Sequence, residues 1–275
     1  MTTSSGNRLP DEKVREYLQF AGALADAARD VTLPHFRSGV SVVDKSGGES
    51  AFDPVTAADR EAEQTMRGMI RDKYPDHGIV GEEFGDHPAA ANSDPPVTWV
   101  IDPIDGTKSF IAGFPTWGTL IGINDGGGAV AGIMDQPFTG ERFTGGPDGA
   151  ALDGRPLRSR SCDGLAAATL YCTDRSMFAT DRQRDIFDRV AARAALTRYG
   201  MDCYAYCMLA HGSVDLVIEG SLKPYDIQAL VPIVRGAGGA ISSWTGGAPE
   251  PGGLVVAAGD PTLHAQVLEL LADGI

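Results

Sequence analysis

Residues 99–107 read Trp-Val-Ile-Asp-Pro-Ile-Asp-Gly-Thr, an apolar run that ends in two aspartates three residues apart. The apolar residues predict a buried strand, and Asp102 follows it directly, where a carboxylate needs a strong partner. Pro103 fixes the turn, and Gly106 lets the chain reverse. Because two like charges this close are costly unless a cation lies between them, Asp102 and Asp105 predict a cation site.

Other carboxylates stand beside glycines or at the ends of apolar runs. Asp59 follows Asp53 in one short segment, Glu82 and Glu83 lie between two glycines, and Asp226 follows Lys-Pro-Tyr. Hard cations such as Mg²⁺ take carboxylate oxygens, water and substrate phosphate as ligands. Two such ions roughly 3.5–4 Å apart activate a water molecule and stabilise the leaving oxygen of a phosphate ester. The acidic residues suit that kind of site, although a solvated loop charge is the preferred interpretation of Glu83 taken alone.

The net charge bears on which partners are excluded. The 275 residues include 23 Lys and Arg against 37 Asp and Glu, which gives −14 at neutral pH. Such a surface repels nucleic-acid backbones and anionic lipid heads, so we expect neither nucleic-acid nor membrane binding. It also repels a small phosphate ester unless a bound cation reverses the sign locally. The 35 glycines and 17 prolines favour many tight turns over a helical bundle.

Several sequence signals are absent, and their absence excludes further classes of function and indicates where the protein is expected to be located. No apolar run reaches the length of a bilayer span, and residues 1–10 lack the apolar core of a secretory signal. The four cysteines show no CxxC spacing, which suits a reducing compartment, so we expect a cytoplasmic protein. No Gly-Lys dipeptide, GxGxxG or GxSxG occurs, which argues against the P-loop, simple dinucleotide-binding and α/β-hydrolase classes.

Hydrophobic periodicity predicts the order of the elements. Helices are predicted at 14–31, 58–70, 181–195, 204–211, 226–235 and 262–271. Strands are predicted at 78–80, 97–101, 120–123, 130–134, 168–172, 214–218, 240–244 and 254–257. The pattern predicts an α+β domain over 1–148 and an α/β domain over 149–275, divided near the glycine-rich stretch 145–153.

Four acidic segments together resemble the successive signatures of one protein family. They are Asp-Pro-Val-Thr-Ala-Ala-Asp at 53–59, Gly-Glu-Glu at 81–83, Asp-Pro-Ile-Asp-Gly-Thr at 102–107 and Pro-Tyr-Asp at 224–226. In this order they resemble the inositol monophosphatase family, whose members are Mg²⁺-dependent, lithium-sensitive phosphomonoesterases. The resemblance covers most of the chain, and its third segment is highly specific. It implies an α+β / α/β fold, a layered αβαβα sandwich of the inositol monophosphatase type, which is commonly a homodimer.

The resemblance also implies a role for each matching residue. It implies two or three Mg²⁺ ions held by Glu82, Asp102, the Ile104 carbonyl, Asp105 and Asp226. Thr107 and Asp59 would orient and deprotonate the attacking water, assisted by Glu82. The backbone amides of Gly106 and Thr107 would hold the phosphate, since a helix N-terminus attracts anions.

The C-terminal half, where family members recognise the leaving group, most resembles the histidinol-phosphatase branch. The resemblance lies in three stretches, 198–206, 214–219 and 223–226. Asp202 stands where inositol-specific relatives tend to have a small neutral residue, and Glu219 matches a substrate-contacting acid, as does Asp226. Two acids facing the alcohol suit a cation such as L-histidinol, so the expected activity is hydrolysis of L-histidinol phosphate in histidine biosynthesis. Asp202 has a second interpretation, as the N-cap of the helix that follows it.

Other substrates and one other class of function stay open. The family also includes phosphatases of inositol 1-phosphate, fructose 1,6-bisphosphate and nucleotide 3′-phosphates, and Lys108 resembles the nucleotide branch. A non-catalytic metal or phosphate sensor is the alternative from another class. The water-activating set of Thr107, Asp59 and Glu82 argues against it, because binding alone needs no water activation.

Three features depart from the family pattern. Tyr225 stands where the family usually has Trp, and Pro232 should kink the helix that follows Asp226. The loop around Lys45 is longer than in animal inositol enzymes, so no role is assigned to that lysine. None of these departures removes a predicted ligand.

Overall fold

The computed structural model describes residues 8–38, 42–44, 54–91 and 93–272, so Lys45 and Asp53 lie outside the described residues. The helices are α1 (Asp11–Thr32), α2 (Ala57–Lys73), α3 (Thr107–Ala112), α4 (Asp181–Ala191), α5 (Tyr204–Ala210), α6 (Pro224–Ile227), α7 (Leu230–Gly236) and α8 (Pro261–Ala272). The strands are β1 (Val42–Asp44), β2 (Pro54–Thr56), β3 (Gly78–Gly81), β4 (Thr98–Asp105), β5 (Gly118–Asn124), β6 (Ala129–Gln136), β7 (Glu141–Gly146), β8 (Gly149–Leu152), β9 (Arg155–Pro156), β10 (Thr169–Cys172), β11 (Leu196–Tyr199), β12 (Leu216–Leu222), β13 (Ala240–Ser243) and β14 (Gly253–Ala258).

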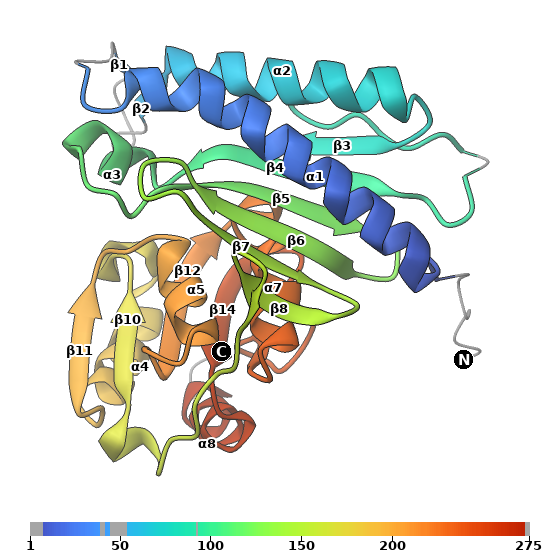
Figure 1. The fold of residues 1–275 in the computed structure, drawn as a ribbon. Coiled ribbons are helices and arrows are strands. Elements are labelled where there is room, and N and C mark those ends of the chain that lie inside the picture. Colours follow the sequence, from blue (N-terminus) through green and yellow to red (C-terminus); the bar gives the residue numbers. More distant parts are fainter. Residues whose placement is uncertain (1–7, 39–41, 45–53, 92, 273–275) are drawn as a thin grey trace.

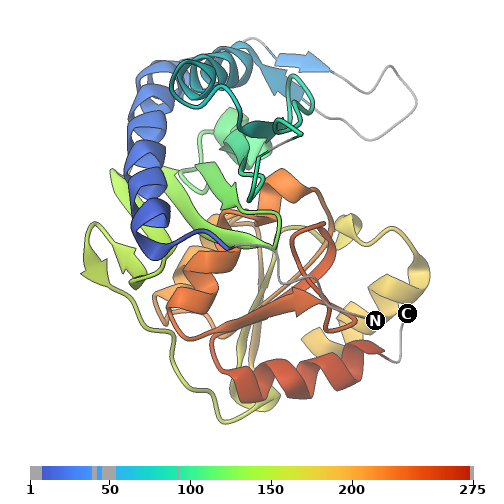
Figure 2. The ribbon, with the colours of Figure 1, turned by 90° about the vertical axis from the view of Figure 1, so that its right-hand side faces the viewer.

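The elements form five layers, as Figures 1 and 2 show. Helices α1 and α2 cover the outer face of a first sheet, and α5, α6 and α7 lie between the two sheets. Helices α4 and α8 cover the outer face of the second sheet. The layered αβαβα sandwich of the inositol monophosphatase type is therefore confirmed. Within the described part of the chain, no helix combines the length and the apolar character that crossing a membrane requires.

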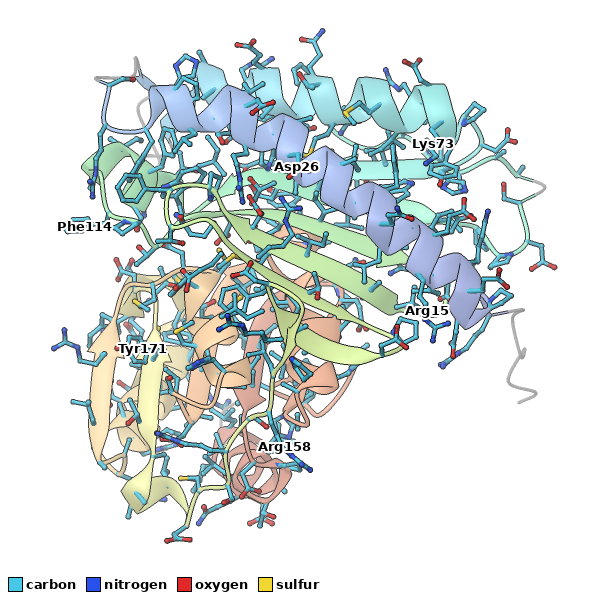
Figure 3. All side chains as sticks on the ribbon, viewed as in Figure 1. Arg15, Asp26, Lys73, Phe114, Arg158 and Tyr171 are labelled. Carbon is cyan, nitrogen blue, oxygen red and sulfur yellow. The ribbon has the colours of Figure 1, made fainter. Side chains whose placement is uncertain are left out.

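The first sheet has the strand order β3-β4-β5-β6-β7-β8-β9, parallel between β3 and β4 and antiparallel elsewhere. The predicted hairpin of β5 and β6 is confirmed. Helix α1 buries its predicted apolar face on this sheet and is tied to it at the rim. There two α1 residues labelled in Figure 3 form ion pairs: Arg15 pairs with Asp148 at 2.7 Å, and Asp26 pairs with Arg142 at 2.6 Å.

The sequence-based boundary at 148/149 falls inside the β7–β8 hairpin. The first sheet continues to Pro156 in β9, and the chain enters the second sheet only at Thr169 in β10. Strands β7, β8 and β9 escaped prediction because the glycine-rich stretch 145–153 is typical of a linker. A division of the chain by its two sheets therefore lies between Pro156 and Thr169.

The second sheet has the order β11-β10-β12-β14-β13, parallel from β11 to β12 and antiparallel over the rest. Its edge strand β11 was not predicted. The predicted helix 181–195 was too long, since α4 ends at Ala191 and the chain then turns into β11. The sequence Leu-Thr-Arg-Tyr of this strand is short and largely exposed, so it gives little periodic signal.

The predicted helix 226–235 is two short helices. Helix α6 ends at Ile227, α7 begins at Leu230, and Pro232 lies in the first turn of α7. A proline ring clashes with the carbonyl group four residues earlier, here that of Gln228, so one continuous helix is disfavoured. The interruption agrees with the kink expected from Pro232, although Gln228 and Ala229 keep helical backbone angles.

Three glycines on adjacent strands let α6 and α7 lie directly on the first sheet. Gly122, Gly132 and Gly145 are in register across β5, β6 and β7. A Cβ atom on Gly132 would lie 2.1 Å from the carbonyl oxygen of Ala229, and one on Gly145 would lie 2.3 Å from an α7 backbone nitrogen. Larger residues would push the helices off the sheet. This close approach sets the position of Asp226 relative to β4.

Candidate active site

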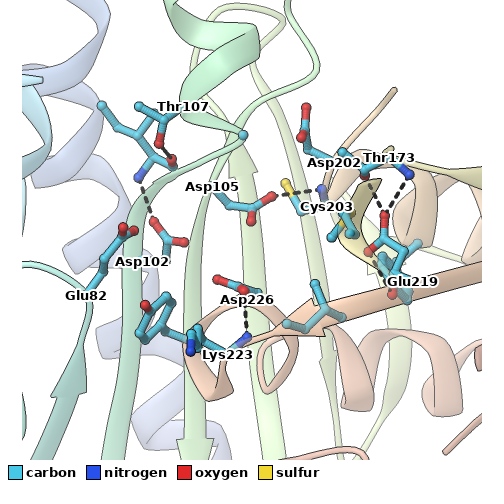
Figure 4. A pocket seen from close by; sticks show the side chains of 16 residues that line it. Glu82, Asp102, Asp105, Thr107, Thr173, Asp202, Cys203, Glu219, Lys223 and Asp226 are labelled. Carbon is cyan, nitrogen blue, oxygen red and sulfur yellow. Dashed lines mark hydrogen bonds between the residues drawn. The ribbon is translucent and has the colours of Figure 1, made fainter. Parts of the chain in front are cut away.

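A cavity of about 280 Å³ opens between the two sheets, at the end of β4 (Figure 4). Every predicted site residue except Asp59 lines it: Glu82, Asp102, Ile104, Asp105, Gly106, Thr107, Asp202, Glu219 and Asp226. The structure thus brings together residues that are up to 144 positions apart in the sequence, from Glu82 to Asp226. Asp59 is 1% exposed and lies in the first turn of α2.

A bulge in β4 directs Asp102 and Asp105 to the same side. Asp102 lies opposite Leu120 and Asp105 lies opposite Gly118, so three steps along β4 face two steps along β5. In a regular strand, residues three apart point to opposite faces, and the one extra residue cancels this alternation. The predicted convergence of the two aspartates therefore has its physical cause in an irregular strand rather than in a turn after the strand.

Asp102, Asp105 and Asp226 form one group. A carboxylate oxygen from each lies within 4.8 Å of the others, and the side chains face one another in Figure 4. Burial raises the pKa of Asp102 and Asp105 well above the usual range, and neighbouring carboxylates raise it further. Burial also raises the pKa of Asp226 to about 7, although the amide of Lys223 donates a hydrogen bond to it. These acids resist ionisation unless positive charge is brought among them.

Glu82 links this group to a second cluster of acids. Glu82, Glu83 and Asp59 each place a carboxylate oxygen within 4.8 Å of the others. Among the neighbouring charges, Glu82 raises the pKa of Asp102 most. The interpretation of Glu83 as a solvated loop charge was wrong: its side chain is 1% exposed and pairs with Arg60 at 3.0 Å.

The Thr107 hydroxyl and the Ile104 carbonyl are in direct contact. The hydroxyl donates a hydrogen bond of 3.1 Å to that carbonyl oxygen, and the Ile104 amide donates one of 3.1 Å to Asp102. Gly106 precedes α3 with a φ of +80°, in the left-handed region that favours glycine. A Cβ atom there would lie 2.9 Å from the carboxyl group of Asp202, so glycine is required on two grounds.

Asp202 does not cap α5, so that interpretation was wrong. The N-cap of α5 is Cys203, and no side chain caps it. Instead the Ser109 hydroxyl donates a 2.6 Å hydrogen bond to the Asp202 carboxylate. Gly200, Met201 and Asp202 have φ values of +87°, +92° and +47°, a run of left-handed residues that is unfavourable for the two with side chains. This backbone directs the Asp202 carboxylate to the cavity.

Glu219 lies on β12 at the opposite end of the cavity from Glu82 (Figure 4). It is 2% exposed and accepts hydrogen bonds from the amide and the hydroxyl of Thr173 and from the hydroxyl of Tyr206. Burial nevertheless raises the pKa of Glu219 to about 7. Sequence reasoning missed the supporting Thr173 and Ser109. The local signals were the place of Thr173 directly after β10 and that of Ser109 in the first turn of α3.

Comparison with known proteins identifies the family. The sequence model of the inositol monophosphatase family matches residues 13–275. The chain belongs to this family. The bifunctional phosphatase IMPL2 of Arabidopsis thaliana is 41% identical over 98% of this chain and 79% of its own length. A histidinol-phosphatase of Mycobacterium tuberculosis is 34% identical over 94% of this chain and 98% of its own length. The solved structure of an inositol monophosphatase from Zymomonas mobilis is 38% identical, covers 94% of this chain and 98% of its own, and has a TM-score of 0.82.

Inositol monophosphatase family proteins are phosphatases of small esters and are generally metal-dependent, and the carboxylates of this chain fit such a metal. Lys223 is the one basic residue among the described residues that line the cavity, and one cation cannot neutralise the six acids there. A hard divalent cation takes oxygen ligands of this kind and would offset their repulsion. The residues that would hold it are Glu82, Asp102, Asp105 and Asp226, with the carbonyl of Ile104.

We expect Mg²⁺ to raise the melting temperature of the metal-free protein more at pH 8 than at pH 5. The carboxyl pKa of Asp226 is about 7 in the folded protein and about 3.9 when unfolded, so the stability of the metal-free fold falls as pH rises between these values. Asp102 and Asp105 act in the same direction. A cation competes with protons for these groups, so its effect grows with pH. At a hundred times the dissociation constant it adds about 2.7 kcal/mol, on the order of 5–10 °C.

The measurement is a thermal melt in excess EDTA and in excess Mg²⁺ at each pH. Burial lowers the pKa of His77 and His264, so these groups lose stability as pH falls below about 6.5. Their contribution is the same with and without Mg²⁺ and cancels in the difference. A shift that is equal at both pH values would contradict the assignment of these acids to a cation site.

Proposed function

We propose that the chain is a Mg²⁺-dependent phosphomonoesterase that hydrolyses L-histidinol phosphate to L-histidinol and phosphate. The observation that carries the choice of substrate is the pair of half-buried Asp202 and buried Glu219, at the end of the cavity away from Glu82 and Asp102. A relative named histidinol-phosphatase that matches over nearly the whole chain supports it.

The residues of this chain divide the work of hydrolysis. In this proposal the Gly106 and Thr107 amides hold the phosphate, and the Thr107 hydroxyl orients the attacking water. Asp59, assisted by Glu82, takes the proton of that water. When bound, two or three Mg²⁺ ions supply positive charge to the phosphate oxygens and lower the pKa of a water molecule.

The alcohol end of the substrate decides which ester is hydrolysed. The cation and the phosphate-binding amides treat every phosphate ester alike, so discrimination must come from groups that contact the alcohol. Histidinol carries an ammonium group and an imidazole ring, and buried carboxylates attract both when these are protonated. Because Ser109 occupies one oxygen of Asp202, the other oxygen is the one that faces the substrate in this proposal. A neutral polyol gains much less from such acids.

Replacing Asp202 by Asn should reduce kcat/KM for histidinol phosphate about ten- to hundredfold while changing that for inositol 1-phosphate little. A charge-assisted hydrogen bond is worth about 1.5–3 kcal/mol, and each 1.4 kcal/mol is tenfold. Asparagine keeps an acceptor for Ser109, so the positioning hydrogen bond survives. The measurement is steady-state kinetics of both esters in saturating Mg²⁺.

Asp174→Asn is the matched control. Asp174 lines a second cavity next to the first one. The substitution removes the same charge as Asp202→Asn does, but the Asp174 side chain is exposed, so water screens its charge. We expect little change in the ratio of the two esters. If Asp202→Asn lowers both esters equally, or if Asp174→Asn has the same effect, Asp202 does not select the alcohol.

An inositol phosphate is the second candidate substrate. The observation in its favour is the 38% identity to the inositol monophosphatase of Zymomonas mobilis over nearly the full length of both chains. This candidate predicts that Asp202 and Glu219 accept hydrogen bonds from ring hydroxyls. The first candidate predicts that the wild type prefers histidinol phosphate, and the second predicts that it prefers inositol 1-phosphate.

A further inference from the structure

Helix α2 carries a stripe of buried charge that no apolar pattern predicts. Asp59, Glu63 and Arg67 follow one another at intervals of four residues and therefore share one face of the helix. They are 1%, 0% and 4% exposed. Charged side chains this deeply buried are rare unless they are paired. The proposed function uses Asp59 and leaves Glu63 and Arg67 without a role.

Glu63 binds the loop that carries Glu82. One of its carboxylate oxygens accepts a 2.8 Å hydrogen bond from the Glu83 amide, and the other accepts a 3.2 Å bond from the Phe84 amide. Arg67 donates to that second oxygen at 2.7 Å and also to the carbonyl oxygen of Gly85. The pair therefore holds three consecutive residues, all on the C-terminal side of Glu82.

The residue before Glu82 is held by the same carboxylate. A Cβ atom on Gly81 would lie 2.5 Å from an oxygen of Glu63, so the glycine backbone packs directly against it. Gly81 also pairs with Ile101 in the register of β3 and β4, which brings Glu82 beside Asp102. Glu82 is thus fixed on both sides, and its side chain points toward Asp102 in Figure 4.

We propose that Glu63 and Arg67 are positioning residues that hold Glu82 in the cation site and so set the affinity of the site for Mg²⁺. Neither side chain lines the cavity, and both act through the backbone of residues 81–85. The inference rests on the part of the proposed function that assigns Glu82 to a cation. Partners outside the immediate ligands of a metal typically change its affinity 10- to 100-fold when they are replaced.

The test is the Mg²⁺ dissociation constant of the full-length, metal-stripped protein, measured by titration calorimetry with Mg²⁺ alone. Glu63→Gln keeps the shape of the side chain but removes the charge and leaves one oxygen for three donors. We expect about 10- to 100-fold weaker binding, with a circular dichroism spectrum like that of the wild type. Arg67→Lys keeps the charge but loses the two-pronged contact, and should weaken binding in the same direction. This second variant carries the test if the first does not fold.

Asp215→Asn is the matched control. Asp215 is also buried and accepts two hydrogen bonds from one arginine, Arg160, and a third from a backbone amide. It directly precedes β12 of the second sheet, and it does not line the cavity. We expect it to lower the melting temperature and leave the dissociation constant unchanged. Wild-type affinity in Glu63→Gln and Arg67→Lys, with a melting temperature lowered as in the control, would show that the pair only stabilises the fold. Absence of Mg²⁺ binding by the wild type would overturn the proposed function itself.

Discussion

Asp105→Asn should lower kcat/KM about a thousandfold or more and, at the same time, raise the melting temperature of the metal-free protein. The loss of activity follows because a cation supplies several kcal/mol to the reaction, and each 1.36 kcal/mol is tenfold in rate. The gain in stability follows because the variant removes one of the closely spaced carboxylates whose charges repel one another. Asparagine can still accept the 2.8 Å hydrogen bond that the amide of Cys203 donates to Asp105.

Asp135→Asn is the control variant for Asp105→Asn. Asp135 is fully buried on β6, away from the cavity, and it pairs with Arg29 and Arg142 at 2.8 and 2.7 Å. Its loss removes the carboxylate that pairs with the partly buried Arg29 and one of the two carboxylates that pair with Arg142, so the fold should lose stability while activity per folded molecule persists. An Asp105→Asn protein that melts lower in EDTA than the wild type, or that keeps its activity, would contradict the cation site.

Thr107→Ala should lower kcat about 10²- to 10⁴-fold with a much smaller change in the affinity for Mg²⁺. This range is typical when a group that guides proton transfer in the transition state is lost. The hydroxyl lies at the cavity and already contacts the Ile104 carbonyl, so its removal disturbs no other described hydrogen bond. The measurement is single-turnover kinetics in saturating Mg²⁺.

Thr107→Ser keeps the hydroxyl and should retain most of the activity. The same experiments distinguish water attack from a covalent route through Thr107. Rapid acid quenching of turnover with a ³²P-labelled ester should leave no label on the protein. A phosphorylated side chain that forms and decays at the rate of turnover would refute direct attack by water.

Much of the fold could be predicted because long periodic patterns of apolar residues determine which segments form helices and strands. The first helices, the β5–β6 hairpin and the strand of β4 follow from periodicity alone. Other elements did not follow. Strands β7 and β8 lie in a glycine-rich stretch, and the glycines turn out to serve the close approach of α7 rather than a linker. Edge strand β11 buries too little to leave a pattern. Pro232 did indicate a kink in the predicted helix 226–235, and the structure interrupts that helix at Gln228 and Ala229.

In the site, too, the features that depend on neighbouring residues could be predicted, and those that depend on distant segments could not be predicted from the pattern alone. Asp102 and Asp105 could be paired because their convergence is local, although its cause is a bulge that the sequence does not announce. The approach of Asp226 followed from a resemblance, since no local pattern joins α6 to β4. The direction of Asp202 depends on left-handed backbone at residues that are not glycine, which composition cannot indicate. Glu63 and Arg67 were hidden because charged residues on a helix usually face water.

The most direct measurement is the wild-type ratio of kcat/KM for L-histidinol phosphate and inositol 1-phosphate, determined side by side in saturating Mg²⁺ at pH 8. At that pH Glu219, whose pKa is about 7, is mostly ionised in the folded protein. Ionised Glu219, acting with Asp202 at the alcohol end, should then favour the cationic ester by about a hundredfold or more, since each charge-assisted contact of about 1.5–3 kcal/mol is worth about ten- to hundredfold. A ratio of one, or a preference for inositol 1-phosphate, would contradict the account.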